Sequence, residues 1–563
     1  MEDLISFLAF TILVAVVAWW RTHNDDQDTS TGYFLAGRSL SWFVVGGSLL
    51  LTNLSTEQLV GINGGAYRYG MILMSWEVWS ALSIVAMAVI FLPRYLKSGI
   101  TTIPEFLELR FNSTTRTLSS LVSLLLIVVN VLPFVLMSGA EFMIPVFGLS
   151  KLLGTNETFN LLVVSTTLAT VGGAYAIFGG LKAVAVSDTV NGIGLVIGGL
   201  LIPILGLSFV GEGNVLAGLQ TIVEQHPQRM SSLGDSQSNI PWETLFTGMT
   251  LLTTYYWCTN QGIVQRTFAA KSLAEGQKGT LFAAVMKLAG PAYLVLPGII
   301  AWHIASTGQH GAPNGQDNAY GFLVNLVLPG WAVGFFAATI FGAILSSFNS
   351  FLNSGSTMFG VDIYRGVLKP DATDKQTVRA GKLFGLIVLP LSVGLVAYFK
   401  LYAEKGLFDA MKQTGAILNI PMIAVVFVAF VSKRTPAIAA NVALLTGMAF
   451  QTYFGIMQEN HLFGYEVHWL HLAGINFVHL LVLMAFFRVL APQRDPFDQK
   501  YTEDVDITPW KLAVPVSVIT VLAIAAMYIG MAAKFGLVPG EQLEQEYQQL
   551  HPEPVAEATT ESD

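Results

Sequence analysis

Charged residues are scarce in this chain. Only 12% of its 563 residues are Asp, Glu, Lys or Arg, whereas soluble domains average about 25%. Hydrophobic residues make up 53% and recur in windows of about 20, the length that crosses a hydrocarbon core of about 30 Å. This composition excludes a soluble globular protein and predicts a multi-pass protein of a cell membrane, embedded in the lipid bilayer.

Cysteine pairs and catalytic motifs are also missing. The chain has one cysteine, Cys258, which excludes an intrachain disulfide. It contains no phosphate-binding loop, nucleophile elbow or His-x-Glu metal set, so neither ATP hydrolysis nor another enzymatic activity is indicated, and nothing points to a nucleic-acid partner. The first apolar run has no basic residue before it and no A-x-A cleavage site after it, so we expect a retained helix.

The hydropathy pattern predicts about 14 transmembrane helices. Lysine and arginine are concentrated in every second loop between them. These basic loops begin at Arg21, Arg94, Lys182, Arg266, Arg365, Lys433 and Arg488. Because basic loops stay on the cytoplasmic side, both termini are predicted to lie outside.

Polar, helix-breaking sequence interrupts two of the predicted helices. The runs are LTNLSTEQLVGINGG at 51–65 and TTYYWCTNQG at 253–262, five helices apart. Such runs are tolerated in a bilayer only where protein or a water-filled cavity shields them. Transporters built from two inverted repeats place a discontinuous helix at the same position in each half, with the substrate between them. We therefore predict five-helix core repeats at about 39–209 and 241–431.

The predicted fold class is all-α integral membrane, with one transmembrane transporter domain over residues 1–535 and discontinuous helices at the substrate site. Residues 536–563 are rich in Asp and Glu and contain no Lys or Arg. Such a composition is typical of a solvated segment, so an acidic, disordered tail is expected there.

Six stretches of the chain form an ordered set of motifs: YFLAGRSL (33–40), NLSTEQLVG (53–61), IPEFLELRF (103–111), GGLKAVAVSD (179–188), QRTFAAKSLAEGQKG (265–279) and SSFNSFLNS (346–354). With these motifs the chain resembles the sodium/solute symporter family, and most closely its bacterial sodium/sugar (galactose or glucose) branch. The resemblance implies ten core helices in two inverted repeats, with flanking helices added.

The resemblance also implies a sodium site. Family members bind the ion through backbone carbonyls and two hydroxyls, and the matching positions are Leu51, Leu54, Ala343, Ser346 and Ser347. Some members have serine at the position of Ala343 and bind a second ion, so this alanine favours one. An alternative is that both serines only bond carbonyls of their own helix.

An acidic residue of the family lies on the sodium exit route, and it matches Asp188. An alternative function for Asp188 is that of a helix N-cap, because SDT follows GGLKAVAV.

The resemblance further implies a sugar site. Gln58, Glu77, Ser80 and Lys287 match the hydroxyl partners, Tyr256, bonded to Asn53, matches the residue that stacks on the ring, and Trp257 lies beside it. Trp76, Ile62 and Phe408 match the apolar gates. The alternatives are a structural ion pair between Glu77 and Lys287, and plain packing for the two aromatic residues.

Two positions depart from the sugar branch. Thr253 replaces an asparagine, and Lys412 replaces a glutamine, although a shift of one residue would make Gln413 the partner. Lysine suits a carboxylate or sulfate. The expected function is sodium-coupled symport of a galactose- or glucose-like monosaccharide into the cell, with sodium as the transported ion. Alternatives are sodium- or proton-coupled symport of an acidic or sulfated sugar or another small solute and, more distantly, a membrane sensor.

Overall fold

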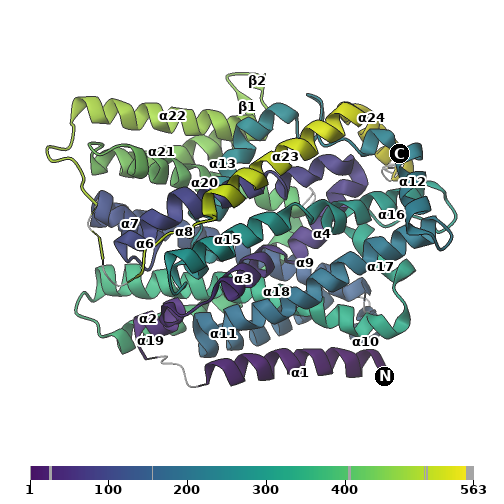
Figure 1. Ribbon diagram of the computed structural model, residues 1–563, viewed down its shortest axis with the longest axis horizontal. Helices are drawn as coiled ribbons and strands as arrows, with labels where there is room; N and C mark the ends of the chain where they lie inside the picture. Colours follow the sequence, from purple (N-terminus) through teal and green to yellow (C-terminus); the bar gives the residue numbers. More distant parts are fainter. Residues whose placement is uncertain are drawn as a thin grey trace, which may run out of the picture.

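The computed structural model describes residues 2–23, 28–146, 148–154, 156–402, 407–499, 501–502 and 505–552. Most of them are helical, and the two short strands β1 (His461–Leu462) and β2 (Tyr465–Glu466) form one antiparallel hairpin. Figure 1 shows most of the helices running along the long axis of the molecule. This arrangement confirms the predicted all-α class.

The longer helices make up the bundle. They are α1 (Glu2–Thr22), α3 (Trp42–Asn53), α4 (Thr56–Tyr69), α8 (Ser113–Leu125), α9 (Leu132–Val146), α11 (Glu157–Val210), α13 (Gly248–Cys258), α15 (Leu273–Lys287), α16 (Leu296–Ser306), α18 (Gly330–Met358), α19 (Asp374–Tyr402), α20 (Leu407–Val431), α21 (Ala437–Phe450), α22 (Trp469–Leu490) and α23 (Ala513–Phe535). Shorter helices connect or extend them: α2 (Ser30–Leu35), α5 (Ser80–Ala86), α6 (Leu92–Ser98), α7 (Ile103–Arg110), α10 (Ser150–Leu153), α12 (Val215–Gln225), α14 (Gln261–Phe268), α17 (Ala319–Val327) and α24 (Gly540–Leu550).

Many of these helices are suited to a bilayer. Within the described residues, 10 helical segments are long and apolar enough to cross a membrane, and α15 with α16 forms one more, bent by 48°. α1 and α3 contain shorter apolar stretches. The multi-pass architecture is therefore confirmed, while the count of 14 stays a prediction.

A glycine divides the longest helix, α11. Gly180 has φ 63° and ψ −175°, a backbone conformation that residues with a side chain rarely adopt. A Cβ at this position would also lie 3.1 Å from the backbone oxygen of Tyr33. The kink turns α11 into two spanning segments, Glu157–Ile177 and Gly179–Val210.

The two predicted helix breaks are present. α3 ends at Asn53 and α4 begins at Thr56, while α13 ends at Cys258 and α14 begins at Gln261. We call the segment between α3 and α4 the first break, and the segment between α13 and α14 the second break. The division into two inverted repeats stays a prediction.

The predicted disorder of the tail is wrong for its first part. α24 is a helix that packs on α4: Glu544 pairs with Arg68, and the Tyr67 hydroxyl lies 2.7 Å from His551 Nε2. Glu546 pairs with Arg229 at 3.0 Å. The acidic composition of the tail predicted a solvated end, because it carries no information about arginine partners that lie far away in the sequence. Residues 553–563 lie outside the described part.

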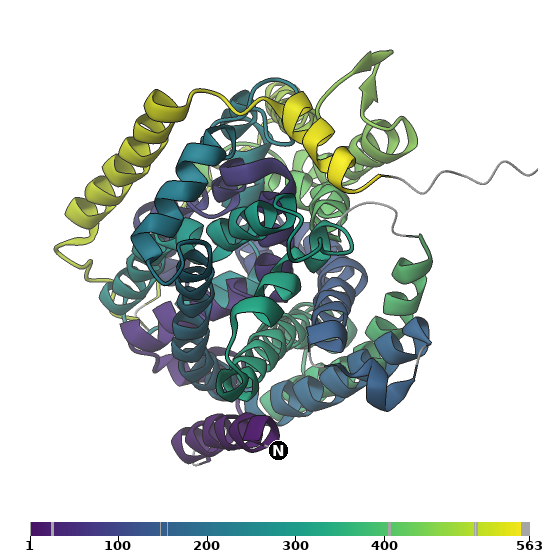
Figure 2. The ribbon, with the colours of Figure 1, turned by 90° about the vertical axis from the view of Figure 1, so that its right-hand side faces the viewer.

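The beginning of α1 and α24 lie at the same end of the bundle, on the right of Figure 1. Viewed from that end, Figure 2 shows α24 at the upper edge and α1 at the lower edge of the bundle. The start of α1 and α24 are therefore on one side, and that this is the outer side stays a prediction.

Candidate functional site

The first break leaves backbone carbonyls available. Ser55, which precedes α4, has extended φ and ψ, and its amide donates to the carbonyl of Asn53 at 3.0 Å rather than continuing the helix. A helix end leaves its last carbonyls without helical partners. Among the described residues, no backbone amide donates to the carbonyl oxygen of Leu51 or of Leu54. These are the two carbonyls that the family resemblance assigns to sodium.

Two serines of α18 face the first break. Ser347 Oγ donates to the carbonyl of Thr52 at 3.0 Å, and Ser346 Oγ donates to Asp188 Oδ1 at 2.6 Å. Ala343 lies one turn earlier on α18 and is also buried. The alternative that both serines bond only carbonyls of their own helix is therefore wrong, because their hydroxyls connect α18 to α3 and to α11.

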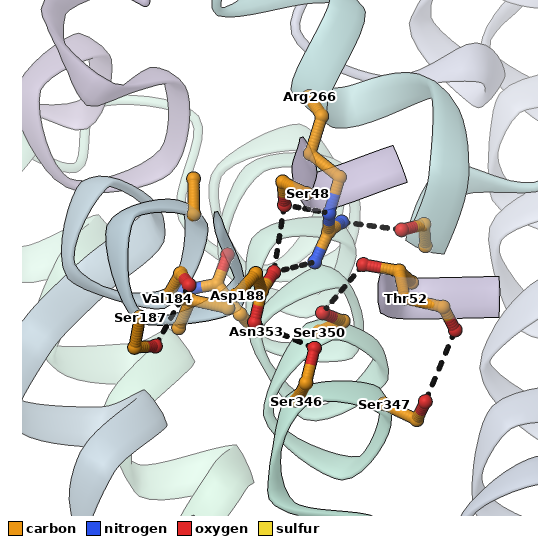
Figure 3. A network of polar contacts seen from close by, with 12 residues as sticks. Ser48, Thr52, Val184, Ser187, Asp188, Arg266, Ser346, Ser347, Ser350 and Asn353 are labelled. Carbon is orange, nitrogen blue, oxygen red and sulfur yellow. Dashed lines mark hydrogen bonds and ion pairs between the residues drawn. The ribbon is translucent and has the colours of Figure 1, made fainter. Parts of the chain in front are cut away.

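Asp188 is the centre of a buried polar network (Figure 3). Ser48 Oγ donates to Asp188 Oδ2 at 2.7 Å, and Arg266 Nε donates to Ser48 Oγ at 3.0 Å. The Arg266 guanidinium lies 4.0 Å from the same carboxylate, and both side chains are fully buried. A buried ion pair needs such extra hydrogen bonds to offset the loss of hydration.

Asp188 is not a helix N-cap. It lies inside α11, beyond the kink at Gly180, and its carboxylate bonds side chains of α3 and α18 rather than the amides of its own first turn. The N-cap alternative is therefore wrong, and Asp188 directly adjoins one of the two serines assigned to sodium.

The atoms around the first break suit a hard cation. They are oxygens of carbonyl, hydroxyl and carboxylate groups, the ligands that alkali and alkaline-earth ions prefer. In the described part of the chain, no group of three or more His, Cys, Asp or Glu side chains could hold a metal ion. The oxygen set can bind a monovalent ion without a dedicated acidic cage.

A cavity lies beside the first break. Seven of the predicted substrate residues line it: Asn53, Gln58, Ser80, Thr253, Tyr256, Trp257 and Lys412. They come from α3, α4, α5, α13 and α20, so the fold gathers residues that are far apart in the sequence. The predicted gate residue Trp76 also lines the cavity.

Glu77 and Lys287 lie behind this lining. Their charged groups are 2.5 Å apart and buried, and the Lys287 ammonium also donates to Asn53 Oδ1. Glu77 and Lys287 therefore form the buried ion pair that the sequence analysis gave as the alternative to sugar binding. The pair contacts the cavity through Asn53, which it holds in place.

Lys412, rather than Gln413, lines the cavity. Its ammonium lies 4.7 Å from the ring centre of Phe408, 5.3 Å from that of Trp76 and 5.8 Å from that of Tyr256. Trp76 packs edge-on against Phe408, with ring centres 5.6 Å apart, so two of the predicted gate residues are in contact. Aromatic faces attract a cation at these distances.

Sequence reasoning missed three amides of the cavity, namely Asn130, Asn260 and Asn419. A signal was present for Asn130 and Asn419, because each is a single amide within an apolar run. Asn130 also belongs to the π-helix η4 (Leu126–Val131), and π-bulges are frequent at functional sites.

Some polar atoms around the cavity have no partner among the described residues. They include Gln58 Oε1, the Trp76 indole nitrogen and Asn419 Oδ1, all of which are buried. Buried polar groups are usually hydrogen-bonded, and each exception needs an explanation. Acceptors and a donor arranged around one cavity are suited to a ligand with hydroxyl groups.

The comparison with family models decides the class of this protein. Residues 33–447 match the model of the "Sodium:solute symporter family". The chain belongs to this family. It is accordingly a sodium-coupled solute transporter of a membrane, not an enzyme, and sodium is the coupling ion.

Curated relatives agree with this assignment. The chain is 44% identical over 534 residues to the "Uncharacterized symporter YidK" of Escherichia coli (strain K12), covering 95% of this chain and 91% of the relative. It is 32% identical over 475 residues to a "Sodium/glucose cotransporter" of Vibrio parahaemolyticus, covering 81% and 85%.

Among solved structures, a Na+-coupled sialic acid symporter in a substrate-bound outward-open state has the same fold. The comparison of the two structures gives a TM-score of 0.72 at 20% sequence identity, and it covers 89% of this chain and 99% of the sialic acid symporter chain.

Proposed function

We propose that this protein carries out sodium-coupled symport of a galactose- or glucose-like monosaccharide into the cell. The observation that supports this most is the cavity beside the first break. Its polar lining includes Gln58, Ser80 and Asn53, with Tyr256 as an aromatic platform. Hydroxyl-rich rings with an apolar face are held by such a combination of donors, acceptors and aromatic surface.

The proposed sodium ligands are the carbonyls of Leu51, Leu54 and Ala343 and the hydroxyls of Ser346 and Ser347. Asp188, hydrogen-bonded to Ser346, is proposed to receive the ion on its exit route. An ion between α3 and α18 would fix the end of α3. Because Asn53 on α3 and Gln58 on α4 line the cavity, this would couple ion binding to solute binding.

The Vibrio parahaemolyticus relative is a sodium/glucose cotransporter by name, which supports a hexose as the solute. A membrane potential of 100 mV contributes about 2.3 kcal/mol for each sodium ion that enters.

One observation favours a second candidate, the symport of an acidic or sulfated sugar. The Lys412 ammonium lines the cavity beside three aromatic rings. A lysine at this position suits a carboxylate or sulfate on the solute. Lys412→Gln separates the two candidates, since a neutral hexose tolerates this change whereas an anionic sugar loses most of its uptake.

Uptake of labelled galactose and glucose into proteoliposomes tests the proposal. An inward sodium gradient is expected to drive uptake of one of them, and a proton gradient alone is not. Unlabelled hexoses, acidic sugars, sulfated sugars and amino acids are then compared as competitors. Sodium-driven uptake of a labelled acidic or sulfated sugar without uptake of either hexose supports the second candidate, and no sodium-driven uptake of any of these sugars contradicts both.

A further inference from the structure

The hairpin of β1 and β2 lies between two membrane-spanning segments. α21 continues as the π-helix η10 (Gln451–Met457), and this spanning segment ends at Met457, while the next one begins at Trp469. β1 begins at His461, so an extended chain places it within about 14 Å of the end of the first segment. Figure 1 and Figure 2 both show the hairpin projecting sideways from the bundle, at the top of each view. The hairpin therefore extends along the membrane surface rather than away from it.

The two faces of the hairpin differ in polarity. His461 pairs with Glu466 in the antiparallel ladder, and Leu462 pairs with Tyr465. Successive residues of a strand point to opposite faces, and paired residues share a face. One face therefore carries an imidazole and a carboxylate, whereas the other carries Leu462 and Tyr465. Because Tyr465 is 80% exposed, the protein itself leaves the apolar face largely uncovered.

The turn of the hairpin holds a phenylalanine in an unfavourable backbone conformation. Phe463 has φ 51°, and the next residue, Gly464, has φ 90°. Two-residue turns with positive φ at both positions prefer Asn or Asp before Gly, and a bulky residue is rare in this region. Phe463 is 83% exposed, so contacts within the protein cover little of its ring. Strain of this kind clusters at functional sites, which indicates that the ring has a partner outside the protein.

Aromatic rings connect the turn to the lipid-facing surface of the preceding span. The ring centre of Phe463 lies 5.6 Å from that of Phe454, which in turn lies 4.8 Å from that of Phe450. Tyr453 and Met457, near the end of the same spanning segment, are both exposed. Exposed side chains of a spanning segment face lipid. The apolar side of the hairpin is therefore continuous with a surface that faces lipid.

We propose that Phe463 and Tyr465 anchor the hairpin in the headgroup layer of the bilayer. Aromatic residues are enriched at membrane interfaces because an apolar ring reaches the lipid while a polar tip stays in water. Burial of the Phe463 ring at the lipid surface offsets the cost of its backbone conformation. The polar face, with His461 and Glu466, faces water. The partner of this surface is the lipid itself and not another protein.

The experiment measures the surroundings of single nitroxide labels by electron paramagnetic resonance. The protein is reconstituted at one copy per nanodisc of phosphatidylcholine and phosphatidylglycerol. Phe463→Cys and Tyr465→Cys each keep the other aromatic residue, and Glu466→Cys reports on the polar face. The wild type is the blank for labelling, because its one cysteine, Cys258, is fully buried. Collision rates are measured with oxygen, which is concentrated in lipid, and with a water-soluble nickel chelate.

Two reference sites calibrate these rates. Leu522→Cys is the lipid reference, because Leu522 lies within the spanning helix α23 and is 62% exposed. Gln549→Cys is the water reference, because Gln549 is exposed on the polar helix α24. Both positions are on the surface, so the label fits at each without repacking of the protein.

At positions 463 and 465, the oxygen rate is expected to be about threefold or more above that at 549, and the nickel rate lower by a similar factor, as at a membrane interface. The nickel rate at 466 should match that at 549. Rates at 463 and 465 equal to those at 549 overturn the proposal, because the hairpin then lies in water. Low rates for both reagents also overturn it, because protein then covers the rings. Water-like rates in these nanodiscs, with spin–spin broadening at 463 in nanodiscs that hold two copies, assign the surface to a second copy instead.

Discussion

The first and second breaks differ in the way their ends are closed. At the first break, Ser55 occupies the N-cap position of α4 but makes no capping hydrogen bond, and its hydroxyl has no partner among the described residues. At the second break, Asn260 caps α14 by accepting from Gly262. We call the first break open, because the start of α4 has no capping hydrogen bond, and the second break closed, because Asn260 caps the start of α14.

The backbone carbonyls at the two breaks also differ, because those at the second break accept hydrogen bonds. The Tyr255 carbonyl at the second break accepts from the amides of Thr259 and Asn260 and from the Thr259 hydroxyl. The Cys258 carbonyl accepts from the hydroxyl of Tyr95. We therefore propose that the two interruptions serve different functions: the open break offers its carbonyl oxygens to the ion, whereas the closed break only positions side chains of the cavity.

The largest effect is expected from removing the charge next to the first break. Asp188→Asn leaves the buried Arg266 without its carboxylate, which costs about 3–5 kcal/mol when one partner of a buried pair is lost. We expect a lower melting temperature and no sodium-driven uptake. The double variant Asp188→Asn with Arg266→Leu should regain thermal stability but not uptake.

Asp362 provides the control for this prediction. It is also fully buried and pairs with an arginine, Arg116, at 2.8 Å, but it lies in η9 (Phe359–Leu368) and its carboxylate bonds Arg116 and Thr102 rather than a residue of the first break. Asp362→Asn should destabilise the protein while the remaining uptake keeps its sodium dependence. Equal loss of sodium dependence in both variants would contradict the special position of Asp188.

A smaller effect is expected from one hydroxyl at the first break. Ser347→Ala removes a proposed ligand, and the sodium concentration for half-maximal uptake should rise about 10-fold, equivalent to about 1.4 kcal/mol. Ser392→Ala is the control, because Ser392 is a buried helix serine whose hydroxyl, among the described residues, bonds the Val388 carbonyl of its own helix and no other group. An unchanged sodium requirement in Ser347→Ala would remove this residue from the site.

At the second break, the loss of the cap should lower stability without changing the sodium requirement. Asn260→Ala removes the N-cap of α14, which costs about 1 kcal/mol. The melting temperature should fall slightly and the sodium requirement should not change. A raised sodium requirement would show that the two breaks are not functionally distinct.

The smallest effect concerns α24, which packs on α4, the helix that follows the first break. Burial and the neighbouring Arg68 lower the pKa of His551, which also contacts Tyr67 and Tyr547. Docking therefore favours the neutral imidazole, so its stabilising effect is complete above pH 6.5 and weakens as the pH falls below that value. Hydrogen exchange of 541–550 should be less protected at pH 5.5 than at pH 7.5, and His551→Gln should abolish the difference. Equal protection of the wild type at both pH values would contradict a contribution of His551.

The sequence predicted the parts of this comparison that depend on local composition. Polar runs within apolar helices located both breaks, and the family motifs identified Ser346, Ser347 and Asp188. The caps were not predictable in the same way, because Ser55 and Asn260 are both typical N-cap residues and only the structure shows that one of them makes the bond.

Long-range contacts explain what sequence reasoning missed. The helix α24 depends on Arg68 and Arg229, which are hundreds of residues away from it in the chain. The amides Asn130 and Asn419 come together only because η4 and α20 are neighbours. Asn130 and Asn419 each stand out locally as a single amide in an apolar run, but nothing in the nearby sequence shows that they meet, and nothing in the tail shows its arginine partners. The acidic composition of the tail pointed instead to disorder.

The most direct test of the account is the effect of sodium on thermal stability. Purified wild type, Ser347→Ala and Asn260→Ala are melted in sodium chloride and in choline chloride. Sodium at 100 times its dissociation constant adds about 2.7 kcal/mol to stability, so the melting temperature of the wild type and of Asn260→Ala should rise in sodium, while that of Ser347→Ala should rise far less. An equal rise in all three proteins would contradict a sodium site at the first break.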